Sequence, residues 1–308
     1  MIIVVSFVVA AFVSCALTPV VRAFALRAGV VDEPDARKVH TRAVPRLGGV
    51  AVVIAWIVAV AIAASAGLVQ ESPLVVVAVL VVFSIGLRDD VRAIGAAPKL
   101  LAIAAAAALA VAGGVHIERI TLWRHTYELG WLALPVTLAW IAGVTSAFNL
   151  IDGLDGLATG LAIIAATSCS ALLLVRGDQA HAVLLVALVG AGVGFLPYNF
   201  NPATIFLGDS GSFVFGFVLA VTAIAGWQKG ATAIAVGAPL LLFALPLADV
   251  TGSVARRLLR RQPVFAADQR HIHHWLLRRG LTHRESVLVL YACALALAAL
   301  AVLTADLR

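Results

Sequence analysis

The chain has 308 residues, of which 62% are hydrophobic and 12% are charged. Soluble domains are nearer half apolar and a quarter charged, so this composition excludes an ordinary soluble enzyme and indicates a polytopic membrane protein. The net charge of +6 fits basic loops beside membrane spans and does not require a nucleic-acid partner.

Long runs of apolar residues predict an all-α polytopic membrane fold of about ten transmembrane helices in a single domain, residues 1–308. The expected spans are 2–21, 48–67, 74–88, 99–113, 131–148, 157–175, 182–197, 211–226, 231–256 and 286–305. Between the fourth and fifth spans, partial alternation of apolar residues within 114–130 favours a short hairpin.

The loop charges predict the orientation of these spans. Of the 22 Lys and Arg residues, 17 fall in or beside loops on one side of the predicted membrane. Positively charged loops are retained in the cytoplasm, so this side should be cytoplasmic and both termini should lie outside.

The first polar cluster on the cytoplasmic side is the loop DEPDARKVHTRAVPRLGG, residues 32–49. Five basic residues stand there among prolines and glycines: Arg37, Lys38, His40, Arg42 and Arg46. Basic groups in a stiff loop suit contact with phosphate. The plainer interpretation is charge that only sets orientation.

Two adjacent acids, Asp89 and Asp90, end the third span in the sequence GLRDDVRAIG. Adjacent residues on a helix point in different directions, so the two carboxylates should have different roles. One could hold a metal while the other meets a different oxygen. A solvated helix end with arginine neighbours is the alternative.

Three polar residues spaced by three, Asn149, Asp152 and Asp155, occur in NLIDGLDGLATG. On a helix this spacing would place all three toward one site. The glycines between them allow a backbone to approach a ligand closely. A helix break with a single capping Asp is the alternative.

A third acidic motif, FLGDSGSFVFG, places Asp209 beside Gly208 just before the eighth span. Its Ser and Gly residues suit a turn whose amides point at an anion at the start of a helix. A plain capped turn is the alternative interpretation.

Three histidines stand in the most basic loop, in DQRHIHHWLLRRG: His271, His273 and His274. If this segment is helical, His271 and His274 share a face. A zinc site would need three or four ligands closing a tetrahedron, which makes it a weaker interpretation. A solvated loop is the other alternative.

All five motifs fall on the predicted cytoplasmic side. Carboxylates and basic groups that meet at one membrane face indicate a divalent cation together with a polyphosphate substrate. In such a site the metal neutralises charge on the phosphorus oxygens.

The five motifs, in this order, resemble those of the polyprenyl-phosphate N-acetylhexosamine-1-phosphate transferases. The likeness covers roughly residues 20–285 and consists of RKxHxxxxPRxGG, DD, NxxDGxDGL, GDxGS and HxHH. Members of this family start O-antigen, enterobacterial common antigen and teichoic acid linkage units. The HxHH form is more similar to the N-acetylglucosamine branch than to the phospho-N-acetylmuramoyl-pentapeptide transferases.

This resemblance implies a multi-pass enzyme of the bacterial inner membrane whose active site faces the cytoplasm. It implies transfer of a sugar 1-phosphate, with UDP-GlcNAc favoured as donor, to undecaprenyl phosphate with release of UMP. It also implies Mg²⁺ as cofactor, with Mn²⁺ as a substitute, and a homodimer.

The resemblance further implies roles for matching residues. Catalytic roles fall on Asp89, Asp90 and Asp209, and metal ligation on Asp209, Asp90 and Asp155. Nucleotide and sugar contacts fall on Asn149, Asp152, Asp155, Phe206, His271, His273 and His274, with Phe206 stacking on uracil. Phosphate contacts fall on Arg37, Lys38, His40 and Arg46.

Four other functions remain as alternatives at this point. A phospho-N-acetylmuramoyl-pentapeptide transferase differs only in the donor. An intramembrane prenyltransferase would need a DxxxD-like spacing, and an alcohol phosphatidyltransferase would need an Arg after its DG motif. A transporter would place its ionisable groups near the midplane instead of at one rim.

Overall fold

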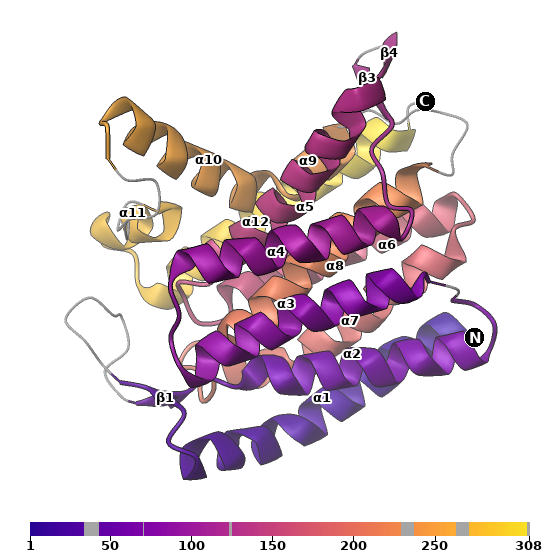
Figure 1. Cartoon of the computed structure of the whole chain (residues 1–308). Coiled ribbons are helices and arrows are strands. Elements are labelled where there is room, and N and C mark those ends of the chain that lie inside the picture. The colour runs from indigo at the N-terminus through magenta and orange to yellow at the C-terminus, as the bar shows by residue number, and fades with distance from the viewer. Residues whose placement is uncertain (34–42, 70, 123–124, 229–236, 263–270, 307–308) are drawn as a thin grey trace.

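Long helices that run side by side form the body of the protein (Figure 1). The computed structural model describes residues 1–33, 43–69, 71–122, 125–228, 237–262 and 271–306. In chain order the helices are α1 (Ile2–Arg27), α2 (Gly48–Ser65), α3 (Pro73–Val91), α4 (Ala96–Ala112), α5 (Ala133–Leu150), α6 (Leu157–Val175), α7 (Gln179–Asn199), α8 (Gly208–Gln228), α9 (Gly237–Leu242), α10 (Ala244–Leu259), α11 (Ile272–Arg278) and α12 (His283–Asp306).

Two short antiparallel strand pairs complete the secondary structure. The strands β1 (Val31–Asp32) and β2 (Val44–Pro45) flank the first loop. The strands β3 (Arg119–Leu122) and β4 (His125–Glu128) form the hairpin expected within 114–130, and a 3-10 turn (Gly130–Leu132) leads from it into α5.

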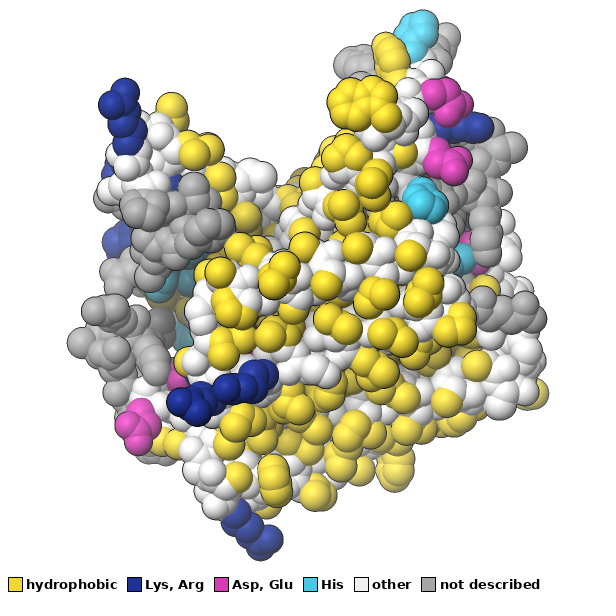
Figure 2. Space-filling model, viewed as in Figure 1, with side chains coloured by type: hydrophobic (Ala, Val, Ile, Leu, Met, Phe, Trp, Pro, Cys, Tyr) yellow, Lys and Arg dark blue, Asp and Glu magenta, His cyan; other side chains and the backbone are white. Residues whose placement is uncertain are grey.

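The helices have the length and composition of membrane spans. Six in the described residues are long and apolar enough to cross a bilayer: Ile2–Arg27, Gly48–Ser65, Gly130–Leu150, Leu157–Val175, Gln179–Asn199 and His283–Thr304. Helices α4 and α8 are apolar but shorter in their described parts. Apolar side chains cover the broad face of the helices in Figure 2, and charged side chains gather toward their two ends. A multi-pass membrane protein is therefore confirmed, while the count of ten spans stays a prediction.

The ninth expected span differs from the prediction. Instead of one helix over 231–256, the described part from residue 237 contains α9 and α10, which meet at Phe243. Pro246 lies four residues after Leu242, and a proline has no N–H to donate to that carbonyl. The hydropathy of the segment conceals this break because the residues on both sides of it are apolar.

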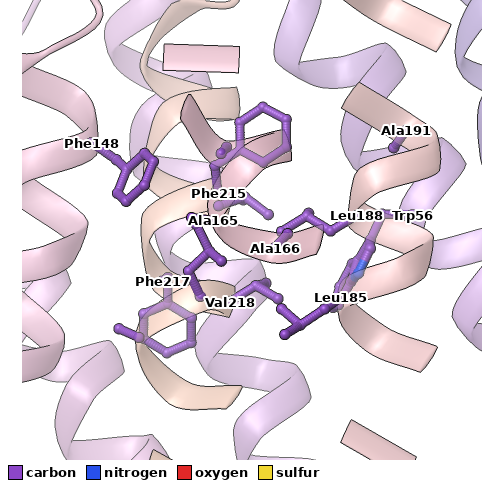
Figure 3. Packing of buried hydrophobic residues seen from close by; sticks show 14 of the residues in the cluster. Trp56, Phe148, Ala165, Ala166, Leu185, Leu188, Ala191, Phe215, Phe217 and Val218 are labelled. Carbon is purple, nitrogen blue, oxygen red and sulfur yellow. The ribbon is translucent and has the colours of Figure 1, made fainter. Parts of the chain in front are cut away.

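The core is made where α2, α5, α6, α7 and α8 meet (Figure 3). Phe148 and Phe217 are fully buried there. Trp56 of α2 donates from its indole nitrogen to the carbonyl oxygen of Leu184 on α7, at 3.0 Å. This bond satisfies the one polar atom of a large side chain that is otherwise packed among hydrocarbon.

Glycines allow the helices that carry the polar motifs to touch. A Cβ on Gly49 of α2 would collide with the backbone of Gly211 on α8. A Cβ on Gly86 of α3 would lie 2.6 Å from the carbonyl carbon of Asp209 on α8. Small residues at helix interfaces are a main source of packing in membranes. Here they fix α8 against both α2 and α3.

The polar motifs collect at one end of the helices. The strand β1 and helix α11 lie at this end, and α1 begins and α12 ends at the opposite end (Figure 1). Every connection that carries a motif in the described residues returns to the same end, which gives them the opportunity to meet.

Candidate active site

A cavity of about 280 Å³ opens at the end of the molecule where the motifs collect. Four of the five motifs contribute to its wall, and the fifth, the pair Asp89–Asp90, lies behind it. The described lining residues are Asp32, Arg46, Asn149, Asp152, Gly153, Leu154, Asp155, Asn199, Phe206, Leu207, Gly208, Asp209, His273, His274 and His283. The structure thus brings predicted residues that lie far apart in the chain together at one cavity.

Asp90 holds the start of α8. Its two carboxylate oxygens accept hydrogen bonds from the backbone N–H of Asp209 at 2.7 Å and of Ser210 at 3.1 Å, and from the Ser210 hydroxyl at 2.5 Å. A carboxylate at a helix N-terminus satisfies free amides and the helix dipole. Gly208 has φ +76°, and a Cβ there would lie 2.6 Å from the Asp90 carboxylate. Asp90 therefore fixes the position of Asp209.

Asp89 faces a different partner, as expected for adjacent helical residues. Its Oδ1 accepts from the Ile94 N–H at 2.8 Å, and its Oδ2 lies 2.9 Å from Lys99 Nζ. The same ammonium lies 2.6 Å from Asp209 Oδ2. Lys99 therefore joins two motifs, a role that the sequence did not indicate because this lysine was counted only as a loop charge. A lysine in the first turn of an apolar helix was the available signal.

The segment between α5 and α6 is a loop, not the helix face that the three-residue spacing suggested. Asn149 belongs to α5, whereas Asp152 and Asp155 follow its end. The left-handed Gly156, at φ +80°, ends the loop as the N-cap of α6. All three polar residues nevertheless line the cavity. Asn149 donates from Nδ2 to Ser212 Oγ on α8 at 3.0 Å.

Asp155 ties several loops together. Its Oδ2 accepts hydrogen bonds from Asn201 Nδ2 and from the Ala203 N–H, each at 3.0 Å. Its own N–H donates to Nε2 of His283 at 2.8 Å. The histidine begins α12 and lines the cavity, and no predicted motif contained it.

Another lining residue that sequence reasoning missed is Asn199, at the end of α7. Its Oδ1 accepts from the Thr159 hydroxyl at 2.8 Å, and its Nδ2 donates to the carbonyl oxygen of Ile205 at 3.2 Å. Both bonds are internal, so Asn199 holds the 200–206 loop against α6. Its position on the last turn of an apolar helix was the available signal.

Negative charge accumulates in the cavity. Burial raises the pKa of Asp152 well above its ordinary value, and the nearby carboxylates of Asp209, Asp90 and Asp155 raise it further. Among the groups that act on Asp152, Arg46 lowers this pKa. Carboxylates that oppose each other's ionisation favour a bound cation.

The carboxylates suit Mg²⁺ better than a metal held entirely by protein. Among the described residues, no three His, Cys, Asp or Glu side chains are grouped closely enough to hold an ion by themselves. Mg²⁺ is usually bound by one or two carboxylates together with substrate phosphates and water. Asp209 and Asp152 both line the cavity and fit that requirement.

His271 is positioned by an acid that sequence reasoning missed. Its Nδ1 lies 2.8 Å from Oδ2 of Asp249 on α10, and Oδ1 of the same acid accepts from the Ile272 N–H at 2.7 Å. Asp249 lies within an apolar segment, and an acid in that setting was the available signal. Of the three histidines, His271 is the one that does not line the cavity.

His273 and His274 line the cavity, so the expected pairing of His271 with His274 is replaced by this neighbouring pair. His273 is buried against Gly153, where a Cβ would lie 2.5 Å from its Nε2. Burial lowers the pKa of His273 to about 3, and His274 and His271 lower it as well. His273 is therefore a neutral hydrogen-bonding group at physiological pH.

The first loop is described only in part. The residues Arg37, Lys38 and His40 lie outside the described residues. Arg46, the fourth predicted phosphate ligand, lines the cavity, and its guanidinium lies 3.4 Å from Asp32 Oδ1. It brings positive charge to a wall that otherwise carries carboxylates.

Phe206 is fixed beside the cavity by its backbone. Its N–H donates to the Pro45 carbonyl oxygen at 2.8 Å, and its own carbonyl accepts from the Gly48 N–H at 3.0 Å. The next carbonyl, of Leu207, accepts from the Gly49 N–H at 2.7 Å. These bonds cap α2 and hold the half-buried Phe206 ring at the cavity wall.

A larger cavity of about 750 Å³ lies between α10 and α11. Arg256, Arg260 and Arg278 line it together with Trp275. The carboxylate on its described wall, Asp249, is already engaged by α11. The smaller cavity therefore is the candidate active site, because it alone joins the carboxylate motifs in the described residues.

The chain is similar to proteins of known family. Residues 72–227 match the family model described as glycosyl transferase family 4. The chain is 36% identical over 293 residues to the "probable undecaprenyl-phosphate N-acetylglucosaminyl 1-phosphate transferase" of Bacillus subtilis (strain 168), covering 94% of this chain and 81% of that protein.

Two further relatives have related names. The decaprenyl-phosphate N-acetylglucosaminephosphotransferase of Mycobacterium tuberculosis (strain ATCC 25618 / H37Rv) is 35% identical over 314 residues, covering 92% of this chain and 77% of that protein. The undecaprenyl-phosphate alpha-N-acetylglucosaminyl 1-phosphate transferase of Thermotoga maritima is 28% identical over 285 residues, with 92% and 85% covered.

Proposed function

The chain belongs to glycosyl transferase family 4, and on that premise we propose that it transfers N-acetylglucosamine 1-phosphate from UDP-N-acetylglucosamine to a polyprenyl phosphate, releasing UMP. The names of the three relatives support the sugar and the lipid acceptor. The structural observation that carries the proposal is the cavity, which is lined by residues of four motifs that are distant in the chain. The fifth motif, Asp89–Asp90, contacts the cavity wall through the hydrogen bond from the Asp209 N–H to Asp90.

The donor would occupy this cavity. The Phe206 ring, held by backbone bonds on both sides, suits stacking on uracil. Arg46 is the described cation of the wall and would contact the diphosphate, with Arg37, Lys38 and His40 of the same loop as further phosphate ligands. Asn149, Asp155 and the neutral His273 would meet hydroxyl and amide groups.

A Mg²⁺ ion would be held by Asp209 and Asp152, with Mn²⁺ as a substitute that accepts the same oxygen ligands. When bound there, the ion supplies charge neutralisation for the diphosphate oxygens and the leaving UMP. Asp90 and Asp155 were also expected as ligands. Both Asp90 oxygens already accept hydrogen bonds, so we assign Asp90 to positioning. Oδ2 of Asp155 also accepts hydrogen bonds, and we assign Asp155 to the donor contact described above instead of the metal.

In the reaction, an oxygen of the lipid phosphate attacks the β-phosphorus of the donor. The bond from this phosphorus to the bridging oxygen breaks, and UMP leaves with the electron pair. A phosphate monoester is mostly ionised at neutral pH because its second pKa is about 6, so the nucleophile needs no general base. Asp89 instead holds Lys99, whose ammonium lies beside Asp209 and would contact the lipid phosphate.

We propose that the cavity faces the cytoplasm of a bacterial plasma membrane, with both termini outside. The distribution of 17 of the 22 Lys and Arg residues supports this orientation. Cysteine labelling in intact cells, with cysteines placed in the β3–β4 hairpin and in the loop after α10, would test it.

The first experiment measures UMP release by the detergent-purified protein. It receives UDP-N-acetylglucosamine, undecaprenyl phosphate and MgCl₂, and parallel reactions contain EDTA, omit the lipid or use Asp209→Asn. We expect release that requires lipid, metal and Asp209. If well-folded protein releases UMP only from UDP-N-acetylmuramoyl-pentapeptide, the sugar is wrong. If no donor yields UMP, the transferase proposal fails.

A further inference from the structure

His283 lies outside every motif that predicted the site, yet it lines the cavity and touches the loop that carries Asp152 and Asp155. It is the first residue of α12, and its side chain is 15% exposed. The side chain of His283 is therefore mostly buried but keeps some exposed surface.

The hydrogen bond from the Asp155 N–H determines which nitrogen of His283 carries a proton. Nε2 accepts that bond at 2.8 Å and so must hold a lone pair. In a neutral imidazole the other nitrogen, Nδ1, then bears the hydrogen. Within the described part of the chain, Nδ1 has no hydrogen-bond partner and is not one of the buried polar atoms without one. His283, which lines the cavity, therefore has an N–H donor at Nδ1 that no described residue uses.

Asp155 supplies a matching acceptor. Its Oδ2 is saturated by Asn201 and Ala203, which leaves Oδ1 as the oxygen that makes no hydrogen bond to another described residue. Oδ1 lies 3.9 Å from His283 Nε2. The imidazole that carries the Nδ1–H donor and the carboxylate that carries the acceptor are therefore neighbours on the wall of the cavity.

We propose that His283 Nδ1–H and Asp155 Oδ1 together bind one hydroxyl group of the sugar being transferred. A hydroxyl both accepts and donates, so it satisfies both partners at once. A phosphate oxygen would only accept and would lie against a carboxylate, which disfavours it. This inference rests on the proposed transferase function and names a residue that determines which sugar is accepted.

The same helix offers a control that separates substrate contact from support of the loop. The Tyr291 hydroxyl donates to the Gly156 carbonyl oxygen at 2.5 Å, and its ring packs on Gly160. Tyr291 thus anchors the same loop but is not a described lining residue of the cavity. Tyr291→Phe removes an anchor and leaves the proposed donor and acceptor in place.

Two substitutions at His283 divide its functions. The amide oxygen of glutamine reaches the place of Nε2, so His283→Gln keeps the bond from the Asp155 N–H and lacks the Nδ1–H donor. The shorter asparagine places its amide near Nδ1, so His283→Asn keeps a donor and loses the loop bond. The substrates are UDP-N-acetylglucosamine and three analogues, each lacking one hydroxyl at position 3, 4 or 6 of the sugar.

We expect His283→Gln to raise KM for UDP-N-acetylglucosamine roughly tenfold, the loss of one hydrogen bond, with a smaller change in kcat. One analogue should be poorer than the parent donor for the wild type, and this difference should shrink for His283→Gln, in which Asp155 alone still contacts the hydroxyl; such coupling is what a double-mutant cycle measures. His283→Asn should keep the discrimination against that analogue, and Tyr291→Phe should keep it too.

The inference is wrong if His283→Gln discriminates among the analogues as the wild type does. It is also wrong if Tyr291→Phe loses discrimination to the same extent, since the effect then belongs to the loop. Both results need a wild type that turns over UDP-N-acetylglucosamine. If folded wild type does not, the proposed function fails first, and the assignment of a sugar hydroxyl fails with it.

Discussion

The two ends of the helices both gather polar residues, but they use them differently. At the end opposite the cavity, Asp178 caps α7 by accepting from the His181 N–H at 3.2 Å, and its Oδ2 also lies 2.7 Å from the ring Nδ1 of that histidine. In the nearby hairpin, Arg119 lies 2.8 Å from Glu128 on the paired strand. These partners are neighbours in the chain or across one turn, and the exception among the described partners is Glu71, whose Oε1 lies 3.6 Å from Nε2 of the same histidine.

At the cavity end the partners come from distant segments. Lys99 bridges the nearby Asp89 and Asp209, which lies 110 residues away in the chain. The described wall of the cavity also holds more carboxylates than cations. Polar contacts between residues that are near in sequence stabilise local structure at a modest cost in free energy. Contacts between distant segments that leave carboxylates without a matching cation cost more free energy. They therefore indicate a site that binds a ligand.

The largest effect should come from breaking the bridge at the cavity end. Lys99→Met removes the ammonium between Asp89 and Asp209 and leaves two carboxylates in opposition. We expect UMP release to fall roughly a hundredfold, comparable with the loss of an electrostatic contact in an active site. Steady-state rates would show this, with Lys99→Arg as the matched control that keeps the charge. Equal activity of Lys99→Met and wild type would refute the bridge's role.

Removal of the helix cap at Asp90 should have the next largest effect. Asp90→Ala leaves the N–H groups of Asp209 and Ser210 without their acceptor. Residues that orient a metal ligand typically change activity by about 10- to 100-fold, and we expect a loss in that range. If Asp90 only positions Asp209, Asp90→Asn should recover much of the activity. Failure of Asn to do better than Ala would return Asp90 to the metal-binding set.

His273 provides a prediction in pH. Its folded pKa of about 3 lies below the ordinary value of 6.5, so its stabilising contribution is present above 6.5 and is lost as the pH falls toward 3. As the pH falls from 6.5 toward 3, the free energy of unfolding should decrease less for His273→Gln than for the wild type. The difference should grow by up to about 1.4 kcal/mol for each pH unit. Thermal unfolding in detergent between pH 7 and pH 5 would measure the difference, and parallel curves would count against a buried neutral ring.

The smallest effect is expected at the opposite end. Asp178→Ala removes the cap of α7, which should cost about 1 kcal/mol of stability. UMP release at permissive temperature should stay near that of the wild type because neither Asp178 nor His181 is among the described residues that line the cavity. A large loss of activity in Asp178→Ala would mean that the two ends are coupled and would weaken the comparison.

The positions of the helices and motifs could be predicted from the sequence because they depend on local composition. Nine of the ten expected spans coincide with helices, and motif residues such as Arg46, Asp152 and Asp209 meet at one cavity. Charge inside or beside an apolar run is costly enough to indicate function without any knowledge of the fold.

The remaining parts of the site depend on contacts between distant segments. Nothing local tells that Asp90 caps α8 while Asp89 binds Lys99. Asp249 was hidden in an apolar run and His283 at the start of another, and each acquires its role only when a second segment packs beside it. The spacing of three in NLIDGLDG was assigned to a helix, although its glycines form a loop.

The contacts of Gly49 and Gly86 with α8 have a consequence for how the protein tolerates mutation. Both glycines lie where a single added methyl group would push away the helix that begins with Asp209. Such a variant would still insert into the membrane, since its hydropathy is unchanged, and it would still be inactive. A mutational screen scored by growth would therefore class these glycines with the aspartates proposed to be catalytic, although neither glycine is a described lining residue of the cavity.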